Sequence, residues 1–188
     1  MTTSEATSLP EGALEEVAAR VGASVQGDHA GAGLRVAAAC SLFNGGITHR
    51  LVVGALDGLF ACGLDRGDVT VAWVPGAFEL PLCARALVGT GSFDAVIALG
   101  AVIRGETGHY DFVAGECAAG LQRVQLDTGV PVVFGVLTTD TVDQALARSA
   151  EDEENKGREA ALTAVAMARL LRSPKLAAPA SKAARSSS

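Results

Sequence analysis

The segment from Arg104 to His109 carries the residue types best suited to chemistry in this sequence. It follows an apolar run and precedes a segment with helical spacing, so its backbone amides stand where a helix begins and anions can bind. Gly105 and Gly108 let a ligand approach the main chain, and Thr107 adds a hydroxyl. His109 can transfer protons near neutral pH. On spacing alone, an anion site and an ordinary helix cap at Thr107 both stay open.

Other candidates are aromatic or charged. Phe43 and Phe78 directly follow strand-like runs, where each ring could pack in the core or stack on a flat heterocycle. Glu79 could accept hydrogen bonds from a polyol or simply favour the start of a helix. Arg148 and Lys156 could be solvated charges, or they could hold a phosphate, Arg through its planar fork and Lys as a point charge.

The elements that must position these residues alternate along the chain. Continuous apolar strands between segments with helical spacing predict an α/β fold, with a parallel sheet and helices on both faces. Ligands bind such sheets beyond the carboxyl ends of the strands, and most of these candidates fall there. The expected strands are 34–41, 68–76, 94–103 and 130–138, and the expected helices are 47–64, 78–87, 110–126, 142–148 and 156–171.

The composition predicts one domain with two flanking segments. The 188 residues favour a single domain, which we place at 34–172. Residues 1–33 form an N-terminal extension, in which a short helix-like segment at 10–21 precedes a glycine-rich linker. Residues 173–188 are rich in Pro, Ala, Ser and Lys, which is typical of a disordered tail.

Charge and hydropathy exclude several classes of protein. The net charge of −6 includes no strong basic stripe, so we expect no nucleic-acid binding. No apolar run is long enough to span a membrane and the N-terminus lacks a signal core, so a cytoplasmic protein is expected. Gly45-Gly46 lacks the spacing of a dinucleotide fingerprint. The four cysteines lack metal-ligand spacing, which favours reduced core thiols: Cys40, Cys62, Cys83 and Cys117.

Taken together, five segments resemble the lumazine synthase family. The resemblance covers residues from about 34 to 172 and implies a three-layer flavodoxin-like sandwich with a four-stranded parallel sheet. It also implies an enzyme of riboflavin biosynthesis, which condenses 5-amino-6-(D-ribitylamino)uracil with 3,4-dihydroxy-2-butanone 4-phosphate. The products are 6,7-dimethyl-8-ribityllumazine, phosphate and water, and no metal or organic cofactor is needed. The segments are LFNGGIT (42–48), VPGAFELP (74–81), ALGAVIRGETGHYDFV (98–113), PVVFGVLTTDTVDQALARS (131–149) and NKGREAALTAVAMARLL (155–171).

The resemblance divides the site residues into two groups. In the first group, His109 would transfer protons, the segment after Arg104 would hold phosphate through main-chain donors, and Phe43 would stack on the pyrimidine. The other members would line the pyrimidine and the ribityl chain. The first group is Phe43, Ala77, Phe78, Glu79, Val102, Ile103, Gly105, Glu106, Thr107 and His109.

The second group would come from the neighbouring subunit, so the active site would be shared. Phe134 would cover the ring, Arg148 would bind phosphate, and Lys156 and Glu159 would help to orient the second substrate. The resemblance therefore implies a homo-oligomer, which is a pentamer in this family and often a 60-subunit shell. It also allows riboflavin synthase as a partner.

Two departures from the family pattern keep an alternative open. Leu42 stands where Arg commonly precedes the Phe-Asn pair, and SAEDEE (149–154) replaces a glycine- and lysine-bearing stretch. A non-catalytic paralogue that binds a lumazine or flavin on the same oligomeric fold would tolerate both changes. The related small riboflavin synthase is disfavoured, because its substrate carries no phosphate for Thr107 and Arg148 to bind.

Overall fold

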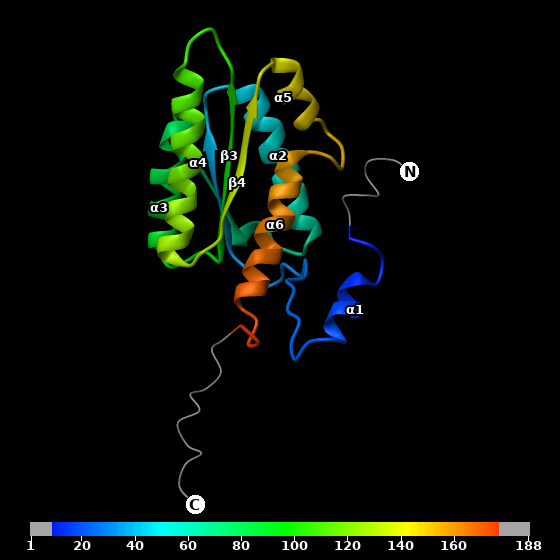
Figure 1. The fold of residues 1–188 in the computed structure, drawn as a ribbon. Helices are drawn as coiled ribbons and strands as arrows, with labels where there is room; N and C mark the ends of the chain where they lie inside the picture. The colour runs from blue at the N-terminus through cyan, green and yellow to red at the C-terminus, as the bar shows by residue number, and fades with distance from the viewer. Residues whose placement is uncertain (1–8, 177–188) are drawn as a thin grey trace, which may run out of the picture.

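A four-stranded parallel sheet lies between two layers of helices in the computed structural model, which describes residues 9–176 (Figure 1). The strand order is β2-β1-β3-β4, and every pairing is parallel. This arrangement confirms the predicted α/β sandwich. The strands are β1 (Val36–Ser41), β2 (Val69–Val74), β3 (Ala95–Ile103) and β4 (Val132–Thr139).

The helices divide between the two faces of the sheet. α3 and α4 cover one face, while α2, α5 and α6 cover the other (Figure 1). Alternation along β3 supplies both cores, because Ile97 and Leu99 point toward α2 and α6, whereas Val96 and Ala98 point toward α3 and α4. The helices are α1 (Ala13–Ala18), α2 (Gly45–Ala61), α3 (Leu80–Gly89), α4 (His109–Thr128), α5 (Val142–Arg148) and α6 (Lys156–Leu171), with 3₁₀ turns η1 (Arg66–Asp68) and η2 (Ala77–Glu79).

The element bounds differ from the predicted ones by one to three residues at both edges of the sheet. The helix expected at 78–87 opens with the 3₁₀ turn η2, so α3 begins only at Leu80. β4 continues through Thr139, beyond the predicted end at 138, because Thr138 and Thr139 pair with the last two residues of β3. The helices predicted at 142–148 and 156–171 are confirmed at both ends.

The N-terminal extension is described from residue 9 and packs on α6. α1 is shorter than the predicted 10–21 segment, and none of its residues is buried. Further along, a Cβ added to Gly27 would lie 1.8 Å from the Ala166 carbonyl oxygen. Arg169 Nη2 donates to the Ala32 carbonyl at 2.8 Å, and Arg172 Nη1 donates to that of Gly33 at 3.3 Å. The start of the domain therefore lies beside its end. Most of the predicted tail, from 177 onward, lies outside the described residues.

The four cysteines are free thiols. Cys40 and Cys117 are fully buried, while Cys62 and Cys83 are half-buried. Burial raises the pKa of the Cys117 thiol to about 11. It also raises the pKa of Cys40 to about 12, with a smaller contribution from nearby Cys83. Among the helices that the structure describes, none combines the length and hydropathy that a membrane crossing needs.

Candidate active site

A pocket of about 700 Å³ opens at the carboxyl ends of β1, β2 and β3. We call it the His109 pocket. Every residue predicted for the first group lines it except Glu106, which is exposed beside it. Its lining comprises Phe43, Asn44, Gly76, Ala77, Phe78, Glu79, Ala101, Val102, Ile103, Gly105, Thr107, His109, Tyr110, Phe112 and Val113.

Phe43 is presented to the pocket by hydrogen bonds between the ends of two strands. Its backbone N–H donates to the Pro75 carbonyl at 3.0 Å, and the N–H of Leu42 donates to that of Val74 at 2.8 Å. Asn44 then adopts a left-handed conformation with φ of 55°, and its Nδ2 donates to the Ala101 carbonyl at 2.9 Å. The ring of Phe43 stays 71% exposed at the pocket, so one face is free to stack on a planar ligand.

Glu79 brings a carboxylate to the same pocket. It ends the turn η2, directly before α3, and its side chain is half-buried. Its Oε2 lies 3.1 Å from the position that a Cβ on Gly76 would take, so the glycine leaves room for the carboxylate. Glu79 shares the pocket with the apolar side chains of Phe78, Phe112 and Val113. An apolar pocket with a few placed polar groups is typical of a small-molecule site.

The loop 105–108 leaves its amides free. Within the described residues, none of its backbone N–H groups donates a hydrogen bond. Free amides directly before α4 are suited to an anion, and the helix dipole favours negative charge there. The Thr107 hydroxyl accepts a long bond from the N–H of His109, 3.4 Å, so a local cap accompanies the free amides. His109 is the first residue of α4, and its side chain is exposed at the pocket.

The second predicted group lies elsewhere, in a separate hollow of about 390 Å³ that we call the Arg148 pocket. It is formed along the edge strand β4 by α5 and α6, and it shares no lining residue with the His109 pocket. Lys156 and Glu159 form an ion pair there. Arg148 Nη1 donates to the Gln144 carbonyl at 3.2 Å. The lining comprises Val133, Phe134, Gly135, Leu137, Thr138, Arg148, Lys156, Glu159, Ala160 and Thr163.

Asn155 fixes the linker that separates Arg148 from Lys156. It is buried, and its Oδ1 accepts from the N–H groups of Gly157 at 2.8 Å and Arg158 at 3.3 Å. Its Nδ2 donates to the Ala150 carbonyl at 2.8 Å and to that of Arg50, on α2, at 3.3 Å. The acidic residues 151–154 are exposed, and Lys156 pairs with Glu159 instead of with them.

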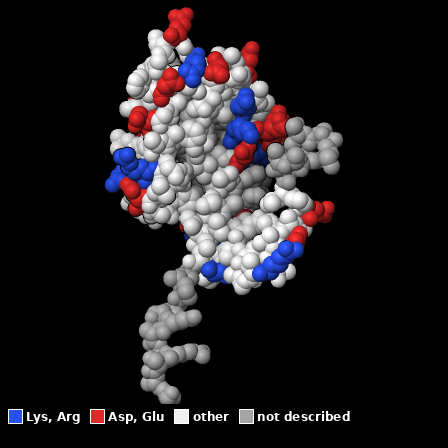
Figure 2. Space-filling view, viewed as in Figure 1, with Lys and Arg blue, Asp and Glu red and all other residues white. Residues whose placement is uncertain are grey.

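Charged side chains of both signs lie on the face of the molecule that Figure 2 draws. Figure 2 shows basic and acidic side chains interspersed around a broad uncharged area on this face. No basic stripe runs over the described residues in this view. Nor do three His, Cys, Asp or Glu side chains of the described chain gather where they could hold a metal ion.

Several pocket residues were missed by reasoning from the sequence. Tyr110 and Phe112 lie one and three residues after His109, so the aromatic residues near that histidine were a usable signal. Asn44 falls just beyond the end of a predicted strand, but its contact with Ala101 could not be predicted, because it joins positions far apart in the sequence. Asn155 likewise contacts a carbonyl on a helix that lies far away along the chain.

Comparisons with known proteins show which family this chain resembles over most of its length. The family model described as 6,7-dimethyl-8-ribityllumazine synthase matches residues 33–172. The 6,7-dimethyl-8-ribityllumazine synthase of Edwardsiella ictaluri (strain 93-146) is 52% identical over 153 residues, which cover 81% of this chain and 98% of that protein. With this identity and with the predicted fold confirmed, the chain belongs to the lumazine synthase family.

Proposed function

We propose that this protein is a 6,7-dimethyl-8-ribityllumazine synthase, which makes the lumazine precursor of riboflavin from 5-amino-6-(D-ribitylamino)uracil and 3,4-dihydroxy-2-butanone 4-phosphate. One observation supports this activity in addition to family membership. The His109 pocket combines an exposed aromatic ring, a carboxylate, a loop of free amides and a histidine. These groups match the pyrimidine, the ribityl hydroxyls, the phosphate and the proton transfers that the reaction requires.

The reaction needs positioning more than a covalent nucleophile. The amine of the pyrimidine attacks the ketone to give a Schiff base and water, phosphate is then eliminated, and the second amine closes the ring with loss of a second water to complete the lumazine. Both new bonds join the two substrates, so the enzyme must hold them in register and move protons. Phe43 and Glu79 orient the pyrimidine and its ribityl chain, and the loop 105–108 receives the phosphate. We assign the proton transfers to His109, which lines the same pocket.

We also propose that the active site is shared between neighbouring copies in a homo-oligomer. The support is the separation of the two predicted groups into two pockets with no common residue. An Arg148 pocket from one copy would complete the His109 pocket of the next, and such a head-to-tail contact gives a ring when the rotation between copies closes. The pentamer expected from the resemblance is such a ring. The cytoplasmic location, the 60-subunit shell and an association with riboflavin synthase stay predictions.

The test is to mix the purified protein with both substrates and follow lumazine absorbance and fluorescence above the uncatalysed rate. We expect clear acceleration, and a loss of roughly 10²- to 10⁴-fold in kcat for His109→Ala, because a general acid–base group contributes about that much. His49→Ala is the matched control, since His49 is exposed on α2 and lines neither pocket.

Two outcomes would contradict the proposal. An unchanged rate in His109→Ala would remove His109 from its role. No acceleration by the folded, oligomeric wild type would favour the non-catalytic binding paralogue, and titration with the lumazine product would then measure its affinity. Sedimentation of each variant shows whether assembly is intact.

A further inference from the structure

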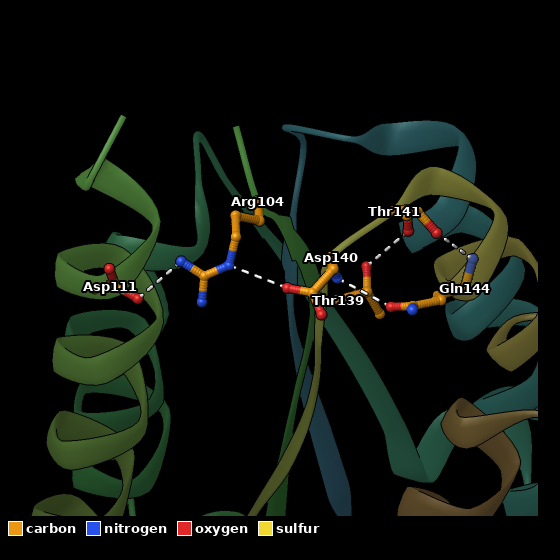
Figure 3. A network of polar contacts seen from close by, with 6 residues as sticks. All are labelled: Arg104, Asp111, Thr139, Asp140, Thr141 and Gln144. Carbon is orange, nitrogen blue, oxygen red and sulfur yellow. Dashed lines mark hydrogen bonds and ion pairs between the residues drawn. The ribbon is translucent and has the colours of Figure 1, made fainter. Parts of the chain in front are cut away.

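Arg104 joins three segments at the carboxyl edge of the sheet (Figure 3). Its Nη1 donates to Asp111 Oδ1 at 3.2 Å, and its Nε donates to Asp140 Oδ1 at 3.0 Å. Its guanidinium also lies over the ring of Tyr110, 4.0 Å from the centroid. One side chain thus connects the end of β3, the first turn of α4 and the residue that follows β4.

The residues that Arg104 contacts on α4 are the two that follow His109. Tyr110 and Asp111 complete the first helical turn, and the loop before it makes few bonds of its own. Within the described chain, the backbone N–H groups of residues 105–108 donate no hydrogen bond. The contacts of Arg104 are therefore the polar restraint on where this turn, and with it His109, lies, beside the packing of Tyr110 and Val113 on the core.

Asp140, the contact of Arg104 at the end of β4, is itself held by several hydrogen bonds. The backbone N–H of Asp140 donates to Gln144 Oε1 at 3.0 Å, and the Gln144 N–H donates to Thr141 Oγ1 at 3.2 Å (Figure 3). Thr139 Oγ1 donates to the Thr141 carbonyl at 3.0 Å. The backbone N–H of Arg104 also donates to the Thr139 carbonyl at 2.9 Å. Asp140 is thus fixed between β4 and the start of α5.

We propose that Arg104 is a positioning residue for this reaction, which holds the first turn of α4 against the end of β4 and so fixes His109 at its pocket. Arg104 lines neither pocket, so it acts through His109 and not on the substrate. Arginine suits the task because its planar fork reaches two carboxylates while its face stacks on the Tyr110 ring. The inference rests on the proposed function, since the effect is on turnover.

The experiment compares Arg104→Gln and Arg104→Lys with the wild type in steady-state kinetics and in product titration. We expect Arg104→Gln to lower kcat by roughly ten-fold, because a misplaced catalytic group costs rate. Product affinity should change by less than about two-fold, since Phe43 and Glu79 keep their places and the product carries no phosphate for the loop 105–108 to bind. Lysine should restore only part of kcat, because a single ammonium does not reproduce the fork.

Arg66→Gln is the matched control. It makes the same change of charge before β2, at the opposite edge of the sheet, where Arg66 forms no ion pair with a described residue. Its kcat should equal that of the wild type. Asp111→Asn removes the charge of one acceptor and keeps the guanidinium, so it tests the same role of Arg104 if the Arg104 variants fold poorly. It should lower kcat in the same sense, by a smaller factor.

The decisive measurement is a double-mutant cycle with His109→Ala. If Arg104 acts through His109, Arg104→Gln should have little further effect on kcat in the His109→Ala background. The full ten-fold loss in that background would overturn the proposal, as would unchanged kcat in both Arg104→Gln and Asp111→Asn. A wild type that does not accelerate lumazine formation would instead refute the proposed function, so the two failures are distinguishable.

Discussion

The proposed role of Arg148 in phosphate binding can be tested by comparing the phosphorylated substrate with a ligand that lacks phosphate. The loop 105–108 offers only neutral amides to a phosphate, and Arg148 supplies a positive charge in the other pocket. Arg148→Ala should therefore raise KM for the phosphorylated substrate by roughly ten- to hundred-fold, the worth of a hydrogen bond to a charged group. Binding of the lumazine product, which carries no phosphate, should change little. Equal losses for both ligands would count against a phosphate role.

The buried thiols predict how stability depends on pH. Because burial raises the pKa of Cys117 to about 11, the folded thiol stays protonated at a pH where the unfolded thiol, near 9, already ionises. The contribution of Cys117 to the free energy of unfolding is full below pH 9 and is lost as the pH rises toward 11. Urea unfolding at pH 8 and pH 10 should show a smaller fall for Cys117→Ala than for the wild type. An identical fall in both proteins would contradict this.

The placement of α6 depends on Asn155, which caps the helix from a buried position. Asn155→Ala would leave the Gly157 amide and the Ala150 carbonyl without their partner, so we expect a loss of about 3 kcal/mol in the free energy of unfolding. Thr141→Ala removes the exposed cap of α5 and should cost about 1 kcal/mol. Urea unfolding at one protein concentration measures both. A smaller loss for Asn155→Ala than for Thr141→Ala would refute the capping argument.

At this scale the sequence was informative where a local pattern decides the structure. Alternation of apolar strands with helical spacing predicted the sheet and its two helical layers, and α5 and α6 were predicted to the residue. The placement of the first group around one pocket was also predictable, since parallel strands end at a common edge. The bridge from Arg104 to Asp140 was not, because only the β3–β4 pairing brings those side chains together. The burial of α1 was not predictable from its amphipathic pattern either, because Leu14 and Val17 remain exposed.

The proposed sharing of the site is a property of the whole assembly. His109→Ala and Arg148→Ala impair opposite halves, so mixed oligomers should contain some sites in which both halves are intact. If the two variants are unfolded, combined in equal amounts and refolded, about one site in four should be intact, because each half has an even chance of coming from either variant. At a concentration of the phosphorylated substrate well below the KM of Arg148→Ala, activity should rise toward a quarter of the wild-type value. No recovery in confirmed mixed oligomers would show that each chain completes its own site.

The contact between the glycine-rich segment near Gly33 and the last turn of α6 has a consequence for connectivity. Arg172 reaches both the Gly33 carbonyl and the carboxylate of Asp94, so the two ends of the predicted 34–172 domain meet beside the start of β3. The packing of the elements therefore does not require the chain to begin and end where it does. A short linker across that contact, with new termini opened at the exposed turn near Gly91, would give a circular permutant whose catalytic edge is untouched.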